Sequence, residues 1–293
     1  MPEGKIMKAL SGFYYVKVND QTYQCRGRGV FRKNKVTPLV GDTVEFQADN
    51  EREGYILDVK SRKNELVRPP ISNVDQAIIA FSAVEPDFNA VLLDRFLVLI
   101  EYKQIHPVIV MTKMDLANDK VKQAMEIIAQ DYRQIGYDWI FTSTEDNVGL
   151  DQLTPYLKEK ISVVAGQSGV GKSSLLNAIN PELELKTNDI STHLGRGKHT
   201  TRHVELIPIA DGFVADTPGF SSLDFDEIEL EDLPFCFPEM AEIGEGCKFR
   251  GCLHLNEPKC AVKQAVETGE IPKYRYDHYM SFSQEIKDRK PRY

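Results

Sequence analysis

The sequence predicts an α/β fold in which a strand-rich N-terminal segment and a helical C-terminal segment flank a central parallel sheet. Three patterns indicate this arrangement. Short strand-like runs separated by turn residues fill residues 13–59. Strands and helices then alternate from residue 77 to residue 179. Four cysteine and histidine residues cluster between positions 247 and 260, and two helical patterns follow them.

The N-terminal segment has four strand-like runs, at 13–18, 21–25, 42–46 and 54–59, with Asn-Asp, Gly-Asp and Asp-Asn turn signals between them. Several short strands in so short a segment predict a small β-barrel, and the OB-fold is the natural candidate. Pro69-Pro70 ends the pattern, so we place a first domain at 1–68.

The charge is unevenly distributed along the chain. The net charge is −8, but residues 1–68 carry 13 Lys and Arg against 9 Asp and Glu, and the last residues are basic again. This asymmetry favours a polyanion partner that meets both ends, although a solvated basic face is an equally good explanation. The basic residues between the second and third runs suit phosphate contacts: Arg26, Arg28, Arg32, Lys33 and Lys35.

The central segment alternates strands and helices. Apolar runs at 77–81, 107–111, 139–141 and 161–165 predict buried strands, and amphipathic runs at 90–104, 121–135 and 150–158 predict helices between them. Such alternation gives a parallel sheet that binds ligands at the carboxyl ends of its strands. We place this domain at 69–228.

The strand at 161–165 leads into a phosphate loop. Residues 166–173 fit the G-x-x-x-x-G-K-[ST] pattern, and a helix pattern at 172–179 follows. Glycines let backbone N–H groups surround phosphate oxygens at the positive end of that helix. Lys172 is expected to reach the β- and γ-phosphates, and Ser173 to ligate Mg²⁺. The predicted nucleotide-binding residues here are Gly166, Gln167, Ser168, Gly169, Val170, Gly171, Lys172, Ser173 and Ser174.

A guanine-reading box follows the strand at 107–111. It resembles N-K-x-D and consists of Thr112, Lys113, Met114 and Asp115. A carboxylate at Asp115 can accept both the N1–H and the N2 hydrogens of guanine; alternatively it caps the helix that begins near Asn118. Thr112 stands where Asn is usual and cannot act as a bidentate amide, so base affinity is expected to be weaker. Thr142 and Ser143 are candidates for a second base contact.

The order of these motifs is unusual. The base box precedes the phosphate loop, and Asp216-Thr-Pro-Gly219 follows it, whereas the base box of an ordinary G domain lies downstream. This order predicts a circularly permuted P-loop GTPase domain. Asp216 is expected to hold Mg²⁺ through water and the Gly219 N–H to contact the γ-phosphate, although Thr-Pro-Gly also forms a plain turn.

The residues that would catalyse hydrolysis differ from those of conventional GTPases. Conventional GTPases orient water with a Gln just after this motif, but that position is Phe220. In the basic loop at 195–202, His199 is our candidate for orienting water, unless it contacts only RNA or the loop backbone. Thr201, with Thr200 as the alternative, is expected to close on Mg²⁺ and the γ-phosphate. The predicted catalytic residues are therefore His199, Lys172 and Thr201.

The C-terminal segment, 229–293, contains a metal-site pattern. Three thiolates and one imidazole within fourteen residues predict one structural, tetrahedral Zn²⁺ per chain, at Cys247, Cys252, His254 and Cys260. Cys236 is a spare thiol that could replace a ligand. Helix patterns at 261–268 and 274–287 follow, and the second is aromatic and basic, which suits either RNA contact or helix packing.

Together these residues resemble the ribosome small subunit-dependent GTPase A family, also called RsgA, YjeQ or YloQ. The resemblance covers nearly the whole chain: the barrel, the permuted motifs, the 195–202 loop and the four metal ligands. It implies an OB-fold, a permuted GTPase domain and an α-rich zinc domain. It also implies a cytoplasmic factor that binds the small (30S) ribosomal subunit and its rRNA late in maturation, with GTP hydrolysis stimulated by the subunit.

Two other functions fit the residues. The chain could be an RNA-binding scaffold whose geometry is locked by nucleotide, with incidental turnover, or a kinase or ATPase that carries Thr-Lys-Met-Asp by chance. No signal peptide or membrane-spanning run is found, and clustered cysteines favour a reducing cytoplasm. A monomer is the default expectation.

Overall fold

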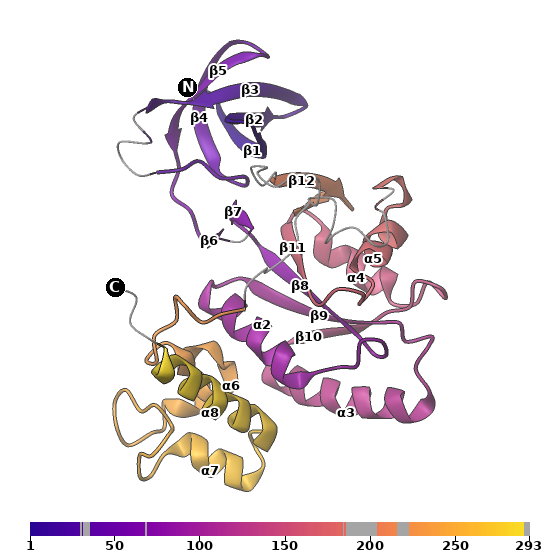
Figure 1. Ribbon diagram of the computed structural model, residues 1–293, viewed down its shortest axis with the longest axis vertical. Coiled ribbons are helices and arrows are strands. Elements are labelled where there is room, and N and C mark those ends of the chain that lie inside the picture. The colour runs from indigo at the N-terminus through magenta and orange to yellow at the C-terminus, as the bar shows by residue number, and fades with distance from the viewer. Residues whose placement is uncertain are drawn as a thin grey trace.

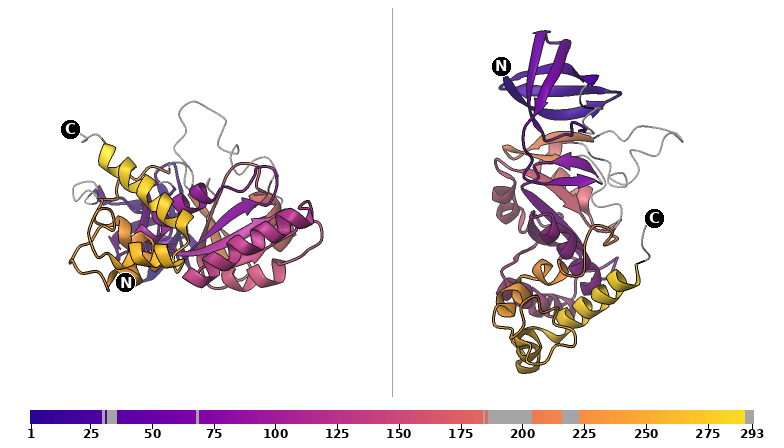
Figure 2. Two further views of the ribbon diagram at one scale, coloured as in Figure 1. Left: turned by 90° about the horizontal axis from the view of Figure 1, so that it is seen from below. Right: turned by 90° about the vertical axis from the view of Figure 1, so that its left-hand side faces the viewer.

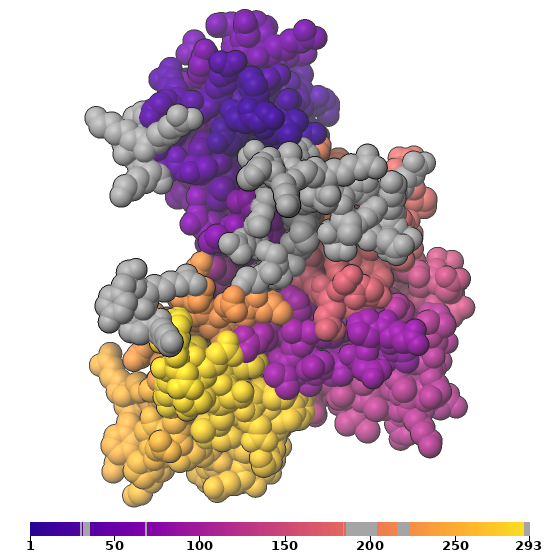
Figure 3. Space-filling model, viewed as in Figure 1, coloured from indigo at the N-terminus to yellow at the C-terminus, as the bar shows by residue number. Residues whose placement is uncertain are grey.

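The computed structural model describes residues 1–29, 31, 36–67, 69–183, 185, 204–215 and 223–289. A β-barrel, a central α/β layer and a helical C-terminal unit follow one another along the long axis of the molecule (Figure 1). The barrel and α8 lie at opposite ends of the face in Figure 3, and Figure 2 gives two further views. Among these residues no helix is long and apolar enough to cross a membrane.

Five strands close the N-terminal barrel: β1 (Glu3–Leu10), β2 (Phe13–Val18), β3 (Gln21–Gly27), β4 (Thr43–Asn50) and β5 (Glu53–Val59). The strand order is β1-β2-β3-β5-β4, and β4 pairs with β1 again, so the sheet closes on itself. This confirms the predicted OB-type barrel. Its centre is filled by side chains that are fully buried: Ile6, Val16, Cys25, Val44 and Ile56.

The sequence pattern missed β1. The strand carries Lys5 and Lys8 among its apolar residues, and its pairing with β2 shifts register between Ile6 and Lys8. A register shift of one residue breaks the alternation that signals a strand.

A two-stranded hairpin, β6 (Glu65–Val67) and β7 (Pro70–Ser72), follows the barrel. Buried Asp42 fixes its position, because this carboxylate accepts hydrogen bonds from Arg62 Nε at 2.8 Å and from Ser72 Oγ at 2.6 Å. The Pro69-Pro70 pair that we expected only to end the strand pattern therefore leads into a second strand.

The central sheet contains parallel strands in the order β10-β9-β8-β11-β13. Their bounds are β8 (Gln76–Ser82), β9 (His106–Thr112), β10 (Asp138–Phe141), β11 (Ile161–Ala165) and β13 (Gly212–Ala215). The helices between them are α2 (Ala90–Tyr102), α3 (Asp119–Ile135), α4 (Leu150–Leu157) and α5 (Lys172–Ile179), followed by the short turn η1 (Pro181–Leu183). These agree closely with the predicted runs.

Helices cover both faces of this sheet. Alternate residues of β8 divide between two apolar cores: Ile79 and Phe81 pack with α2 and α3, and Ile78 packs with α4 and α5. Burial on both faces explains why the strands read as continuous apolar runs.

One strand joins the barrel to the central sheet. β12 (Val204–Ile209) runs antiparallel to β13 on one side and to β1 on the other. Lys8 of β1 lies opposite Glu205 of β12, and their side chains form an ion pair of 2.8 Å. The two sheets are therefore continuous, although they come from segments about 200 residues apart in sequence.

The C-terminal unit consists of η2 (Leu233–Cys236), α6 (Pro238–Gly244), α7 (Ala261–Thr268) and α8 (Lys273–Asp288). Phe237, Tyr279 and Phe282 are buried in its core, and Arg95 of α2 lies over the Phe225 and Phe282 rings. Arg275 is fully buried as well. The suggestion that α8 grips RNA is therefore wrong for Arg275, Tyr279 and Phe282, which pack inside the protein, and it stays a prediction for the partly exposed residues of that face.

Candidate functional site

The phosphate loop connects β11 to α5 at the carboxyl edge of the central sheet. Gly166, Gly169 and Gly171 all have positive φ, at 133°, 83° and 93°. A Cβ on Gly166 would lie 2.1 Å from the carbonyl oxygen of Ala80 in β8, so only glycine fits where the loop crosses the neighbouring strand. The loop conformation thus depends on the glycines that the motif requires.

Lys172 begins α5 and turns back over this loop. Its Nζ donates hydrogen bonds to the carbonyl oxygens of Gly166 at 2.9 Å and Gln167 at 2.6 Å. Burial lowers the pKa of Lys172. The adjacent Ser173 is buried, and the side-chain oxygen of Gln167 is buried without a hydrogen-bond partner among the described residues. The loop therefore holds a partly desolvated cation beside the N-terminus of α5, which suits an anion.

The base box lies at the end of β9, two strands away from β11. Thr112 is buried, and its hydroxyl lies 2.5 Å from the Val170 carbonyl oxygen of the phosphate loop and 3.1 Å from that of Phe81. The hydroxyl proton of Thr112 is thus donated to a backbone carbonyl oxygen of the protein itself. Thr112 ties the base box to the phosphate loop from a buried position.

The other box residues occupy a turn that opens outward. Lys113 has a positive φ of 58°, and its Nζ donates to the Glu85 carbonyl oxygen at 2.5 Å. Asp115 is partly exposed, while Asn118 caps α3 by accepting a hydrogen bond from the Val121 N–H at 3.0 Å. The alternative role for Asp115 as the cap of α3 is therefore wrong, which leaves its carboxylate for a ligand.

The loop after β10 runs beside this box. The Met114 N–H donates to the Thr142 carbonyl oxygen at 3.2 Å, and both Thr142 and Ser143 are buried. The Thr142 hydroxyl donates to the Met111 carbonyl oxygen at 3.2 Å, so this side chain supports the end of β9. A base contact from this loop stays a prediction.

Several predicted residues lie outside the part of the chain that the structure describes. They are Asp216, Gly219, His199, Thr201 and its alternative Thr200. Phe220, which stands where conventional GTPases have Gln, lies outside it as well. Arg32, Lys33 and Lys35 of the basic N-terminal loop also lie outside it. The predicted roles of all these residues stay predictions.

The four predicted metal ligands come together in the C-terminal unit. The ligand atoms of Cys247, Cys252, His254 and Cys260 all lie within 4.8 Å of one another. The two sulfurs of Cys247 and Cys260 are 3.8 Å apart, and Nδ1 of His254 lies 3.6 and 3.3 Å from them. A tetrahedral zinc with Zn–S bonds of about 2.3 Å separates its sulfur ligands by roughly 3.8 Å, so the donor set fits this ion. Cys236 is not part of the cluster.

Neighbouring groups favour the binding of a cation by this cluster. Burial opposes ionisation of Cys247, but hydrogen bonds from the backbone N–H groups of Ala261 and Val262, together with those from the Cys260 and Cys252 side chains, lower the pKa of the thiol. The carboxylate of Glu257 accepts hydrogen bonds from the Leu253 and Leu255 N–H groups at 2.9 and 2.8 Å. These bonds brace the backbone on both sides of His254, as supporting contacts around metal ligands commonly do.

A family model described as RsgA GTPase matches residues 59–226, and a second, described as RsgA N-terminal domain, matches residues 3–56. The chain is 69% identical over 293 residues to the small ribosomal subunit biogenesis GTPase RsgA of Bacillus cereus, and the match covers 100% of both chains. It is 67% identical to the protein of the same name from Geobacillus kaustophilus, also over the full length of both.

The chain belongs to the RsgA GTPase family. Two solved structures agree in fold. The crystal structure of YloQ, described as a circularly permuted GTPase, has a TM-score of 0.86 and 58% identity, and the match covers 100% of this chain and 97% of that one. YjeQ from Thermotoga maritima has a TM-score of 0.87 and 37% identity over 98% and 99% of the two chains. The predicted permutation and GTPase activity are thereby confirmed.

The sequence interpretation of this RsgA-family protein missed residues that join its parts. Asp94 is fully buried in the middle of α2, where its carboxylate accepts a hydrogen bond from Tyr132 at 2.6 Å and pairs with Arg275 and His278 of α8. Glu239 of α6 pairs with the same Arg275 at 2.8 Å. One available signal was an acidic residue within the apolar face of an amphipathic helix, since buried charges are rare unless paired.

Proposed function

We propose that this protein binds the small ribosomal subunit and acts in its late maturation, hydrolysing GTP to GDP and phosphate with stimulation by the subunit. The hydrogen bond between Thr112 and Val170 carries the nucleotide part of this proposal, because it holds the base box and the phosphate loop in one site. The ribosomal part rests on the name of relatives that match over the full chain.

In the proposed nucleotide site, Asp115 reads guanine, and the loop from Gly166 to Ser174 surrounds the phosphates. Lys172 leaves the loop carbonyls for the β- and γ-phosphates. Ser173 and Asp216 hold Mg²⁺, and Gly219 contacts the γ-phosphate. Among the catalytic candidates, His199 orients water, and Thr201 closes the site.

We infer that the C-terminal cluster binds one structural Zn²⁺. Four protein ligands leave no coordination position for a substrate, so this metal stabilises the fold and does not take part in hydrolysis. Two cations thus have separate tasks: Mg²⁺ acts with the nucleotide, and Zn²⁺ organises the C-terminal domain.

The proposed division of the chain is an rRNA-binding OB-fold domain at 1–68, a GTPase domain at 69–228 and a zinc domain at 229–293. The basic balance of residues 1–68 supports the assignment of rRNA contact to the barrel. We propose a monomer in the cytoplasm, where small subunits are assembled and where clustered cysteines stay reduced.

GTP turnover by the purified protein tests this function. We expect slow turnover alone, a large increase with purified small subunits, and no comparable increase with large subunits at the same concentration. ATP in place of GTP is the nucleotide control. A protein that binds GTP tightly but gains no turnover with small subunits would be a nucleotide-locked scaffold. His199→Ala in the same assay should lower stimulated turnover by about 10²-fold without loss of GTP binding, as removal of a general base does.

A further inference from the structure

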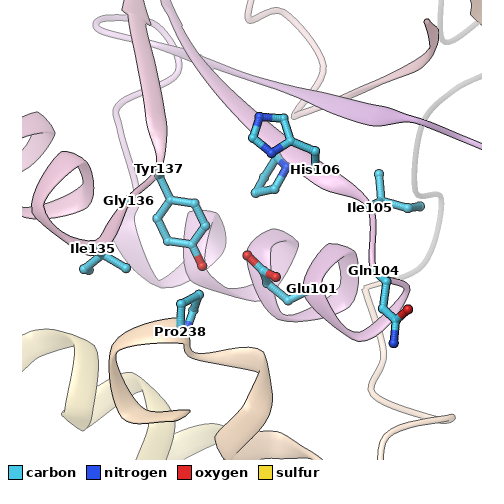
Figure 4. A pocket seen from close by; sticks show the side chains of 9 residues that line it. Glu101, Gln104, Ile105, His106, Ile135, Gly136, Tyr137 and Pro238 are labelled. Carbon is cyan, nitrogen blue, oxygen red and sulfur yellow. The ribbon is translucent and has the colours of Figure 1, made fainter. Parts of the chain in front are cut away.

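A cavity of about 370 Å³ lies where the central sheet meets the C-terminal unit, at the start of β9, whereas the base box lies at the end of that strand. The end of α2 and the start of β9 form one wall, the turn between α3 and β10 forms another, and Pro238 at the start of α6 forms the third (Figure 4). At roughly 30 Å³ per water molecule, this space exceeds the need of one or two bridging waters. It is large enough for a small organic group.

The cavity contains a hydroxyl without a well-formed hydrogen bond. Tyr137 is 6% exposed, and its hydroxyl meets hydrogen-bond geometry with no group in the described part of the chain, although it lies close enough to Glu101 to act against the rise in the pKa of that carboxyl. In Figure 4 this hydroxyl points into the cavity, toward the carboxylate of Glu101. Leaving a buried hydroxyl unpaired is unfavourable, so a ligand that supplies a partner gains binding energy here.

Glu101 adds a negative charge to the same wall. It is only partly exposed, and no ion pair involves it among the described residues. Burial raises the pKa of this carboxyl. The nearest buried cation, Arg275, is already shared between Asp94 and Glu239. Glu101 is therefore a carboxylate that lacks a counter-ion.

The surrounding groups restrict the kind of ligand. Asp138 and Glu239 lie nearby and are negative, and Asp138 already pairs with His106 at 3.0 Å, so the site disfavours an anion. Within the described residues, only the four zinc-ligand candidates form a cluster suited to a metal ion. Ile135, Pro107 and Pro238 provide apolar wall next to the carboxylate. The ligand class that fits these groups is a cation carried on an apolar chain.

We propose that this cavity binds a primary ammonium group carried on an alkyl chain. The ammonium donates hydrogen bonds to the Glu101 carboxylate and to the Tyr137 hydroxyl oxygen, and the alkyl chain packs against the apolar walls. Since Pro238 begins α6, a bound ligand contacts the central sheet and the C-terminal unit together. Either a free polyamine or a lysine side chain of a partner protein has this chemistry.

Titration of the isotope-labelled full-length protein, followed by its backbone amide NMR signals, tests the proposal. The probe is n-butylammonium chloride, with sodium chloride at equal ionic strength as control. We expect a saturable shift of the Gly136 and Gln104 signals, because both residues line the cavity. Glu101→Gln and Tyr137→Phe keep the side-chain shapes, and each should weaken binding, Glu101→Gln by about tenfold. Glu267→Gln, on the exposed face of α7, is the matched charge control and should change nothing.

Two further probes identify the source of the ammonium group. Stronger binding of 1,4-diaminobutane points to a free polyamine, and stronger binding of N-acetyl-lysine methylamide points to a lysine of a partner protein. Shifts that do not saturate, or that persist unchanged in Glu101→Gln, would overturn the proposal and leave a water-filled cavity. The experiment needs no nucleotide and no ribosome, so it is independent of the proposed GTPase function.

Discussion

The hydroxyl oxygen of Thr112 lies 2.5 Å from the carbonyl oxygen of Val170, which joins the end of β9 to the phosphate loop. The two residues are 58 positions apart in sequence. Threonine at the first position of the base box is thus explained by a contact with the protein, because one hydroxyl proton is enough for this bond. The proposed guanine contact then depends chiefly on Asp115.

Thr112→Val removes this bond while keeping the side-chain shape. A buried hydrogen bond contributes about 1 kcal/mol, so we expect GTP affinity to fall by about five- to tenfold. The dissociation constant, measured by fluorescent-nucleotide binding, checks this. Thr154→Val is the control, because its hydroxyl also donates to a backbone carbonyl, that of Leu150 at 2.7 Å, but within α4. Equal GTP affinity in the two variants would show that the contact does not organise the site.

Asp115→Asn should change the base preference. The carboxylate accepts two hydrogens from guanine, whereas an amide offers one acceptor and one donor and so matches xanthine. We expect GTP binding to weaken by about 10- to 100-fold and xanthosine triphosphate binding to strengthen. Competition between the two nucleotides measures the change. Asp119→Asn, an exposed position in the first turn of α3, should leave the preference as it is. If Asp115→Asn kept the preference for GTP, Asp115 would not take part in base recognition.

Cys260→Ser should abolish stoichiometric zinc binding, because it removes one of the four clustered ligands. Cys236→Ala is a matched control: this thiol is also buried in the C-terminal unit but lies outside the cluster. We expect about one zinc per chain in the control and in the unaltered protein, measured by elemental analysis after dialysis. Zinc loss from Cys236→Ala would mean that the ligand set is assigned wrongly.

The ion pairs around Arg275 should contribute strongly to stability. Arg275 donates to Glu239 through Nε at 2.8 Å and also pairs with Asp94, and all three side chains are buried. Arg275→Met leaves Glu239 without a cation and Asp94 with His278 as its one basic partner among the described residues, so we expect the free energy of unfolding to fall by about 3–5 kcal/mol. Urea denaturation measures it. Lys273→Met, two residues earlier on α8, breaks only an exposed pair with Asp277 and should cost less than about 1 kcal/mol.

Stability should depend on pH through Cys25 in the barrel. Burial raises the pKa of this thiol to about 11, whereas an unfolded cysteine ionises near 8.5–9. Between these values the unfolded chain loses the proton and the folded chain keeps it. Stability due to Cys25 is therefore complete below pH 8 and falls as pH rises toward 11.

Cys25→Ala removes this dependence. From pH 8 to pH 10, we expect the unaltered protein to lose about 1.5 kcal/mol more of its free energy of unfolding than the variant loses. Both proteins contain the same other titrating groups, so comparing their pH slopes isolates the thiol. Identical slopes would show that Cys25 ionises equally well in the folded barrel.

The sequence by itself determined most local structure of this protein. The apolar run of β11, the phosphate-loop pattern and the helix after it coincide with the structure, because a continuous apolar run, glycine spacing and helix periodicity are each set within a few residues. The same holds for the metal ligands, which meet because all four lie between positions 247 and 260 on one short segment. Motif order along the chain was also sufficient to predict the permutation.

Only the tertiary structure decided which distant groups meet. The pairing of β1 with β12, the burial of Arg275 against Asp94 and the cavity beside Tyr137 each join segments that are far apart in sequence. Local pattern cannot distinguish a basic, aromatic helix that faces solvent from one that packs inward, since both have the same periodicity. Whether such a helix packs inward depends on the buried carboxylates that the rest of the fold places beside it. A buried cation is stable only where carboxylates compensate its charge.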